Sequence, residues 1–143
     1  MERTVVVVDD DEDMCLVITR GLDRAGGFRV IGVADRGAGA VTLVEEHQPD
    51  VLLLDLGLPD VTEEELIPSL IVAAPRTMVA VLTGRAAEDR EASARAAGAF
   101  TYYEKEMFGT GLFEYLEQDC ELFSRAVAGE DVVAPSAISR RRQ

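Results

Sequence analysis

The stretch 51–56 constrains the fold of this chain more than any other. Four branched apolar residues follow one another without a polar break and lead to a single carboxylate, Asp55. Such a run is typical of a strand that is buried on both faces, and Gly57 and Pro59 then predict a turn. We therefore expect a central parallel strand with Asp55 at its carboxyl end, the edge at which open α/β sheets bind their ligands.

Strand-like and helix-like patterns alternate five times along the chain. The expected strands are residues 4–8, 28–34, 51–56, 77–82 and 100–103. The expected helices are one that ends before residue 26 and the ranges 38–46, 62–74, 87–97 and 112–128. Right-handed crossovers between successive strands force a parallel sheet with helices on both faces. The predicted fold class is therefore α/β, a flavodoxin-like doubly wound sheet of five strands in the order 2-1-3-4-5.

Residues 129–143 fall outside this alternation. We expect one domain over residues 1–128 and a C-terminal extension or linker over 129–143. Within the extension, Pro135 and Ser136 predict the start of a short helix, and the three arginines at 140–142 make a basic end.

The expected helix over 62–74 carries two local signals. Thr62 followed by Glu65 is a capping-box pattern, which predicts that the threonine hydroxyl caps the helix. Pro68 falls inside the helix and predicts a kink or a short first segment.

Composition excludes several classes of protein. The 143 residues carry a net charge of −13, which disfavours nucleic-acid binding and favours a cation or a basic partner. No apolar run approaches the length of a membrane span, and no signal sequence opens the chain. Cys15 and Cys120 have no disulfide or metal-ligand spacing, so we expect buried thiols in the reducing cytoplasm. One lysine, Lys105, stands among thirteen arginines, and its compact ammonium does a different job from a planar guanidinium.

Polar side chains follow the expected strands at the edge where the strands end. Asp9 and Asp10 follow the first strand, and Asp55 lies at the end of the third. Thr83 follows the fourth strand and Lys105 the fifth. Because strands one and three are neighbours in this order, three carboxylates converge in one crevice beside a hydroxyl and an ammonium. Carboxylates this close repel one another unless a cation lies among them, and Mg²⁺ prefers such hard oxygen ligands.

This set of groups fits phosphoryl transfer to Asp55. A carboxylate is a competent nucleophile for forming an acyl phosphate. The metal and Lys105 would neutralise charge on the moving phosphoryl group, and the Thr83 hydroxyl would hold one of its oxygens. Taken singly, each residue has a simpler explanation: acids stabilise a first helical turn, and a strand-end hydroxyl or a loop lysine is ordinary. The agreement of four strand ends favours the functional interpretation.

With these motifs in place, the chain resembles a known family, the receiver domain of the response regulators of two-component signalling. The resemblance covers about residues 3–128 and extends to the spacing, with 28 residues from Asp55 to Thr83 and 22 from Thr83 to Lys105. The matching pieces are residues 8–10, 55–59, 82–84, and 98–99 leading through Tyr102 to Lys105.

The resemblance implies a role for each of these positions. Asp55 is the expected phosphoacceptor. Asp10 and Asp55 would ligate Mg²⁺ together with the backbone carbonyl of Gly57, while Asp9 would act through water. The residues expected to contact the phosphoryl group are Thr83 and Lys105.

The resemblance also implies how a signal leaves the site. Phosphorylation would draw the Thr83 hydroxyl inward and let Tyr102, the switch aromatic, turn into the vacated space; Tyr103 beside it could fill the same role. The surface that changes is then helix four, strand five and helix five. The expected partner is a sensor histidine kinase or a phosphotransfer protein, and a homodimer through that surface is a further expectation. A cytoplasmic phosphoacceptor of a phosphorelay is expected, with no enzymatic activity beyond its own phosphorylation and autodephosphorylation.

Two positions depart from the common pattern of the family. Glu63 stands where many receivers have glycine, eight residues after Asp55, so the family pattern does not predict the conformation of the loop after strand three. Glu106 replaces the proline that is common after Lys105 and resembles receivers coupled to helix-turn-helix output domains. Residues 125–136 resemble the linker of that class, but no helix-turn-helix follows them in this sequence, so we expect either a stand-alone receiver or one cut from a longer chain.

Two other functions compete with this interpretation. A Mg²⁺-dependent phosphohydrolase with an aspartyl nucleophile would carry two acids at the end of strand one, and Asp9 and Asp11 have that spacing. The chain shows no insertion that could form a substrate lid, which disfavours this class. A phosphate-independent pseudo-receiver, acting only as an interaction module, is disfavoured because every acidic and phosphate-contacting position is filled.

Overall fold

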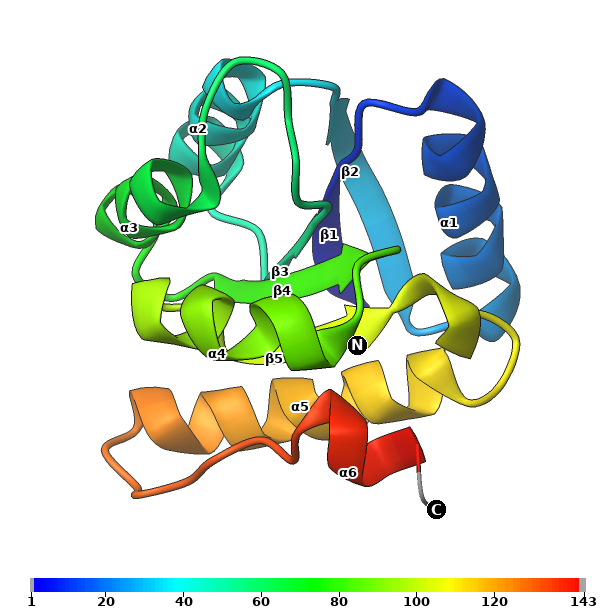
Figure 1. Cartoon of the computed structure of the whole chain (residues 1–143), viewed down its shortest axis with the longest axis vertical. Coiled ribbons are helices and arrows are strands. Elements are labelled where there is room, and N and C mark those ends of the chain that lie inside the picture. The colour runs from blue at the N-terminus through cyan, green and yellow to red at the C-terminus, as the bar shows by residue number, and fades with distance from the viewer. Residues whose placement is uncertain (1, 142–143) are drawn as a thin grey trace.

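The computed structural model describes residues 2–141 as a parallel sheet between two layers of helices (Figure 1). The strands are β1 (Arg3–Val8), β2 (Phe28–Ala34), β3 (Val51–Leu54), β4 (Met78–Thr83) and β5 (Thr101–Glu104). The helices are α1 (Glu12–Ala25), α2 (Gly37–His47), α3 (Glu63–Ala73), α4 (Ala87–Ala97), a short 3₁₀ turn η1 (Lys105–Met107), α5 (Leu112–Val127) and α6 (Ala137–Arg141). The strand order is β2-β1-β3-β4-β5 with every pair parallel, so the predicted fold class is confirmed.

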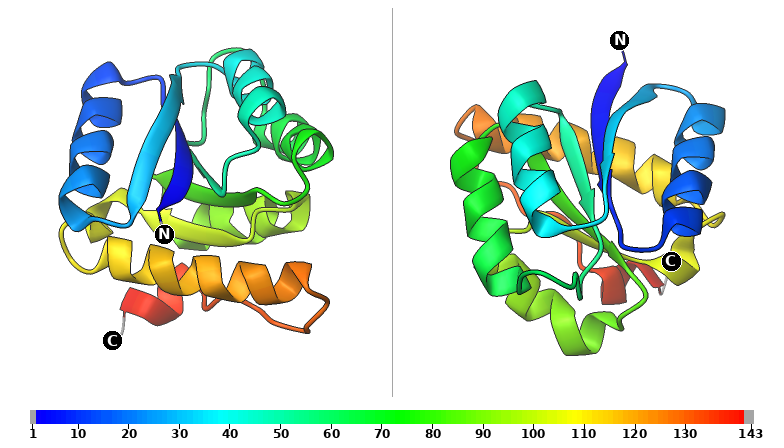
Figure 2. Two further views of the ribbon diagram at one scale, coloured as in Figure 1. Left: turned by 180° about the vertical axis from the view of Figure 1, so that it is seen from behind. Right: turned by 90° about the horizontal axis from the view of Figure 1, so that it is seen from above.

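The unbroken apolar run of β3 is explained by helices on both sides of the sheet. Leu52 and Leu54 pack in the layer that contains α2, α3 and α4, whereas Val51 and Leu53 pack in the layer that contains α1 and α5 (Figure 2). All four are at most 2% exposed. Each buried side chain of this size contributes about 1.5–3 kcal/mol, so a polar residue at any of these positions would weaken the sheet.

The two local signals in α3 predict its structure only in part. Thr62 does occupy the N-cap position, but its hydroxyl makes no capping hydrogen bond, so the predicted capping box is wrong. Its backbone carbonyl accepts from Leu66 N–H at 2.9 Å and from Glu65 N–H at 3.2 Å. Pro68 does not divide the element, because α3 runs unbroken from Glu63 to Ala73.

Among the described residues, no helix is both long and apolar enough to cross a membrane.

The C-terminal extension folds back onto the domain. After α5 the chain reverses direction, and α6 lies along the outer edge of β5 beside α4 and α5 (Figures 1 and 2). The helix that Pro135 and Ser136 predict is present as Ala137–Arg141. Arg142, the last residue of the predicted basic end, lies outside the described residues.

Candidate functional site

The topology brings the predicted site residues together at the carboxyl edge of the sheet. Asp9 directly follows β1, and Asp55 directly follows β3, its neighbour in the sheet. Thr83 is the last residue of β4, and Lys105 is the first residue after β5. Carboxylate oxygens of Asp9, Asp10 and Asp55 lie within 4.8 Å of one another. Three carboxylates from two strand ends therefore share one small volume, as the sequence predicts.

Lys105 partly neutralises this cluster. Its Nζ lies 2.9 Å from Asp9 Oδ2 and 3.3 Å from Asp55 Oδ2. Burial raises the pKa of Asp55 above its usual range, and Asp9 adds to that rise, while hydrogen bonding to Thr83 and the charge of Lys105 oppose it. Burial by itself would lower the pKa of Lys105, but Asp9 and Asp55 outweigh it and raise that pKa. The ammonium therefore stays charged between two acids.

The carboxylate cluster has the donor set of a site for a hard divalent cation. Asp9 is 1% exposed, and its Oδ1 accepts the Asp11 N–H at 2.9 Å. Its Oδ2 is ion-paired to Lys105 Nζ at 2.9 Å. Asp10 is exposed and Asp55 half-buried, so oxygens reach the cluster from both the protein interior and the solvent side. Oxygen ligands of this kind suit Mg²⁺, which keeps several of its waters.

The loop after β3 is held by a residue that the sequence left unexplained. Glu63 Oε1 accepts the Gly57 N–H at 3.1 Å and an Arg90 Nη2 hydrogen bond at 3.0 Å. The first residue of α3 thereby connects the Gly57 turn to α4. Gly57 has φ +81°, a backbone conformation that favours glycine, and Arg85 Nη2, the end of a flexible side chain, lies 2.8 Å from where a Cβ would be. Glu106, the other departure from the family pattern, is exposed in η1.

Sequence reasoning missed Arg85 and Arg90 as neighbours of the site. Neither has a motif of its own, because Arg85 lies against Gly57 and Arg90 pairs with Glu63 from segments distant in sequence. The only signal was position: Arg85 comes two residues after Thr83.

Tyr102 and Tyr103 point to opposite sides of β5. Tyr102 is fully buried on the α4 side, and its hydroxyl donates to the Arg85 carbonyl at 2.8 Å. Burial raises the pKa of Tyr102 to about 12. Tyr103 lies in the layer of α1 and α5, where its hydroxyl donates to Asp119 Oδ2 at 2.5 Å. Of the two tyrosines, only Tyr102 therefore contacts the segment that follows Thr83, and it does so already in its inward orientation.

Comparison with known proteins places this arrangement in a family. The sequence model of the response regulator receiver domain matches residues 5–117, which is most of the chain. This chain belongs to the response regulator receiver family. Receivers are the phosphoacceptor domains of two-component signalling, so the predicted family, fold and general function are confirmed.

Relatives of this receiver are longer proteins. The transcriptional regulatory protein KdpE of Mycobacterium tuberculosis is 35% identical over 134 residues, which are 92% of this chain and 56% of KdpE. A protein-glutamate methylesterase/protein-glutamine glutaminase of Natronomonas pharaonis is 35% identical over 95% of this chain and 39% of its own length. The chain thus spans about half, or less, of these curated relatives. Among solved structures, the receiver domain of the putative response regulator NarL from Mycobacterium tuberculosis has a TM-score of 0.77 and 26% identity over 84% of this chain and 97% of its own.

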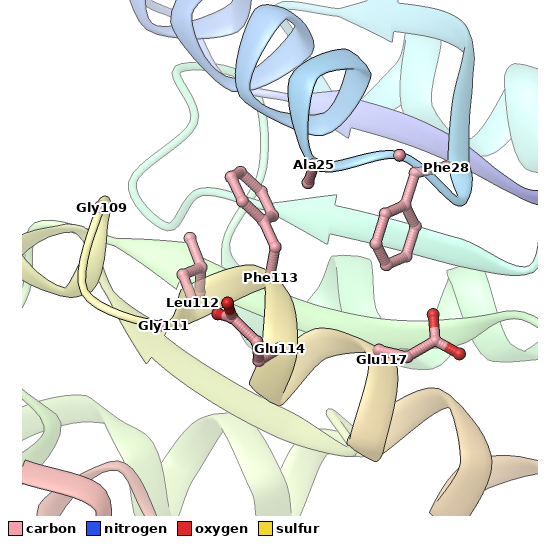
Figure 3. A pocket seen from close by; sticks show the side chains of 9 residues that line it. Ala25, Phe28, Gly109, Gly111, Leu112, Phe113, Glu114 and Glu117 are labelled. Atoms are coloured by element: carbon pink, nitrogen blue, oxygen red, sulfur yellow. The ribbon is translucent and has the colours of Figure 1, made fainter.

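A hollow elsewhere on the receiver is separate from the acidic site. It lies between the end of α1 and the start of α5, where the rings of Phe28 and Phe113 face each other across it and Glu117 stands at its rim (Figure 3). None of the carboxylates near Asp55 lines it. The hollow and the carboxylate cluster are therefore separate features of the structure.

Proposed function

We propose that Asp55 is the phosphoacceptor of this receiver. The observation that carries the proposal is the ammonium of Lys105 lying 3.3 Å from Asp55 Oδ2 at a strand end that also holds two further carboxylates. Asp55 is half-buried, so part of its side chain remains accessible to a donor. Intact-mass measurement after treatment with a small acyl phosphate tests it.

The transfer is a displacement at phosphorus. An Asp55 oxygen attacks the phosphorus of a phosphohistidine, the P–N bond breaks, and the imidazole leaves with the bonding electrons and takes up a proton. Lys105 stabilises the charge on the transferred group, and the Thr83 hydroxyl donates to one of its oxygens. A phosphohistidine donor implies a sensor histidine kinase or a phosphotransfer protein as the partner.

Mg²⁺ is the proposed cofactor. Asp10, Asp55 and the carbonyl of Gly57 would hold it, with Asp9 acting through a water. When bound, the ion would offset the negative charge that the phosphoryl group brings among the carboxylates. The three carboxylates of Asp9, Asp10 and Asp55, whose oxygens lie within 4.8 Å of one another, support a site organised around a cation.

We expect Mg²⁺ to stabilise the receiver, and to do so more strongly as the pH rises. The raised pKa of Asp55 means that its contribution to stability is present below its unfolded-state pKa and is lost as the pH rises through its folded-state pKa. Mg²⁺ binds the ionised carboxylate, so it offsets this loss of stability only at a pH at which Asp55 is ionised. At ten times its Kd, Mg²⁺ should add about 1.4 kcal/mol, or about 3–6 °C in Tm.

Thermal melts at pH 5 and pH 7.5, with EDTA or Mg²⁺, measure this effect. Asp10→Ala should lose most of the shift, whereas Asp23→Ala, on the exposed surface of α1, should keep it. An equal shift in wild type and Asp10→Ala would place the ion elsewhere.

The proposed output is a change in the surface made by α4, β5 and α5. Phosphorylation draws the Thr83 hydroxyl toward Asp55 and alters the packing of Tyr102, whose hydroxyl is bonded to the Arg85 carbonyl. The relatives carry different activities in their names, a transcriptional regulator and a methylesterase, so the output of a longer protein is not set by the receiver. The chain itself, with a net charge of −13, is proposed to act in the cytoplasm without binding nucleic acid or a membrane and without turning over an external substrate.

Thr83→Ala is expected to separate phosphorylation from output. Asp55 should still accept one phosphoryl group, because the nucleophile and Lys105 remain. The change in partner binding or self-association that follows phosphorylation should be lost, since such a switch needs only a few kcal/mol of bias. Phosphorylation measured by mass and association measured by sedimentation test this, with Thr83→Ser as the control that restores the hydroxyl. A wild-type response in both Thr83→Ala and Tyr102→Ala would exclude this pair as the switch.

A further inference from the structure

A buried carboxylate in α5 is unrelated to the phosphorylation site. Asp119 is fully buried and accepts four hydrogen bonds from three residues. Thr101 Oγ1 and Tyr103 Oη, both on β5, donate to its Oδ2 at 2.8 and 2.5 Å. Arg140 of α6 donates to Oδ2 and Oδ1 at 2.7 and 2.6 Å.

The surroundings of Arg140 are shaped for a guanidinium group. The group is bidentate on Asp119, and its central carbon lies 4.6 Å from the ring centre of Tyr115 and 5.8 Å from that of Tyr103. Arg140 is 4% exposed. A planar fork matches a carboxylate and stacks on aromatic rings, whereas a lysine ammonium offers neither fit.

The rest of the segment is held by charged and polar groups of α4 and β5. The Ala137 N–H donates to the Glu91 carboxylate, and Arg95 Nη2 donates to the Pro135 carbonyl at 3.0 Å. Arg141 pairs with Glu88 of α4 and Glu104 of β5. The basic segment thus lies on an acidic face, and α6 covers the edge strand β5.

We propose that the face made by α4, β5 and α5 contains a guanidinium-binding socket, formed by Asp119, Thr101 and Tyr103, whose ligand is Arg140 of the chain's own C-terminal segment. While docked, residues 134–141 exclude every other occupant from this face. A homodimer or partner that uses the same face must first displace the segment. The docking needs no phosphoryl group, so its failure and the failure of Asp55 as acceptor are separate outcomes.

Hydrogen exchange of the full chain tests the docking. The amides of residues 137–141 should be protected in wild type and should exchange at least about ten-fold faster in Arg140→Gln. Arg125→Gln removes an arginine from an exposed pair with Glu130 and should leave the exchange unchanged. Equal exchange in wild type and Arg140→Gln would overturn the proposal.

A synthetic peptide of residues 130–143 tests whether occupancy is exclusive. The labelled peptide should bind full-length Arg140→Gln at least about ten-fold more tightly than wild type, whose socket is filled. A peptide carrying Arg140→Lys should bind more weakly than the natural peptide. Equal binding to both chains, or binding to neither, would contradict a socket that takes one guanidinium at a time.

A second variant guards against a folding defect in Arg140→Gln. Ala137 is fully buried, and its N–H is bonded to Glu91, so Ala137→Glu places bulk and a like charge at the contact while Arg140 remains intact. Circular dichroism checks the fold of both variants. Ala137→Glu should also bind the added peptide more tightly than wild type, and binding no tighter than wild type would overturn exclusive docking.

Discussion

Asp55→Asn is expected to abolish phosphoryl transfer to this chain. The amide keeps the size and most of the shape of the carboxylate but has no anionic oxygen with which to attack phosphorus. Wild type treated with Mg²⁺ and a small acyl phosphate should gain the mass of one phosphoryl group, and the variant should gain none. Lys105 and Thr83 remain in the variant, so the groups proposed to contact the phosphoryl group are unchanged, and the variant loses the nucleophile together with one proposed Mg²⁺ ligand.

Asp13→Asn provides the matched control for this experiment. Asp13 is an exposed acid in the first turn of α1, a few residues from Asp9, and its substitution changes the charge near the site equally. The Asp13→Asn variant should gain the mass of one phosphoryl group, as wild type does. Equal labelling of Asp55→Asn and wild type would show that another residue accepts the phosphoryl group and would contradict the role proposed for Asp55.

The sequence predicts the acidic site well because topology alone brings its members together. In a parallel sheet every strand ends at the same edge, so Asp9, Asp55 and Lys105 had to meet once the five strands and their order were inferred. The apolar run of β3 made that inference strong, since it required helices on both faces. No side-chain detail was needed for this step.

The contacts around the site could not be predicted in the same way. In sequence Glu63 only replaces a common glycine, yet its carboxylate accepts hydrogen bonds from the Gly57 N–H and from Arg90 of α4. Thr62 had the pattern of a cap, yet its hydroxyl makes no capping bond. Both outcomes depend on how loops and helices from different parts of the chain pack, which local sequence patterns do not specify.

Asp119 is the plainest case of a residue that no pattern marked. An acid in an amphipathic helix is normally assigned to the solvent side. It is buried here because Arg140, 21 residues later, folds back to pair with it. The sequence predicts a C-terminal extension or linker over 129–143, and the described part of that segment contributes a buried charge to the domain.

The pair Asp119–Arg140 is expected to give the largest effect on stability of any single ion pair described in this chain. Asp119→Ala removes four hydrogen bonds from a fully buried site, and we expect a loss of about 3–5 kcal/mol in the free energy of unfolding. Arg140→Ala should cost less, about 2 kcal/mol, because Asp119 keeps the hydroxyl donors of Thr101 and Tyr103.

The double variant decides whether the two side chains act as one unit. Once Asp119 is gone, Arg140 has no carboxylate to bind, so Asp119→Ala/Arg140→Ala should be about as stable as Asp119→Ala alone. Urea unfolding of the four chains should therefore give a coupling energy of about 2 kcal/mol. The exposed pair of Arg125 and Glu130, about half exposed at both ends, should give less than about 1 kcal/mol in the same cycle. Additive losses at Asp119 and Arg140 would mean that the C-terminal segment is not held by this pair in solution.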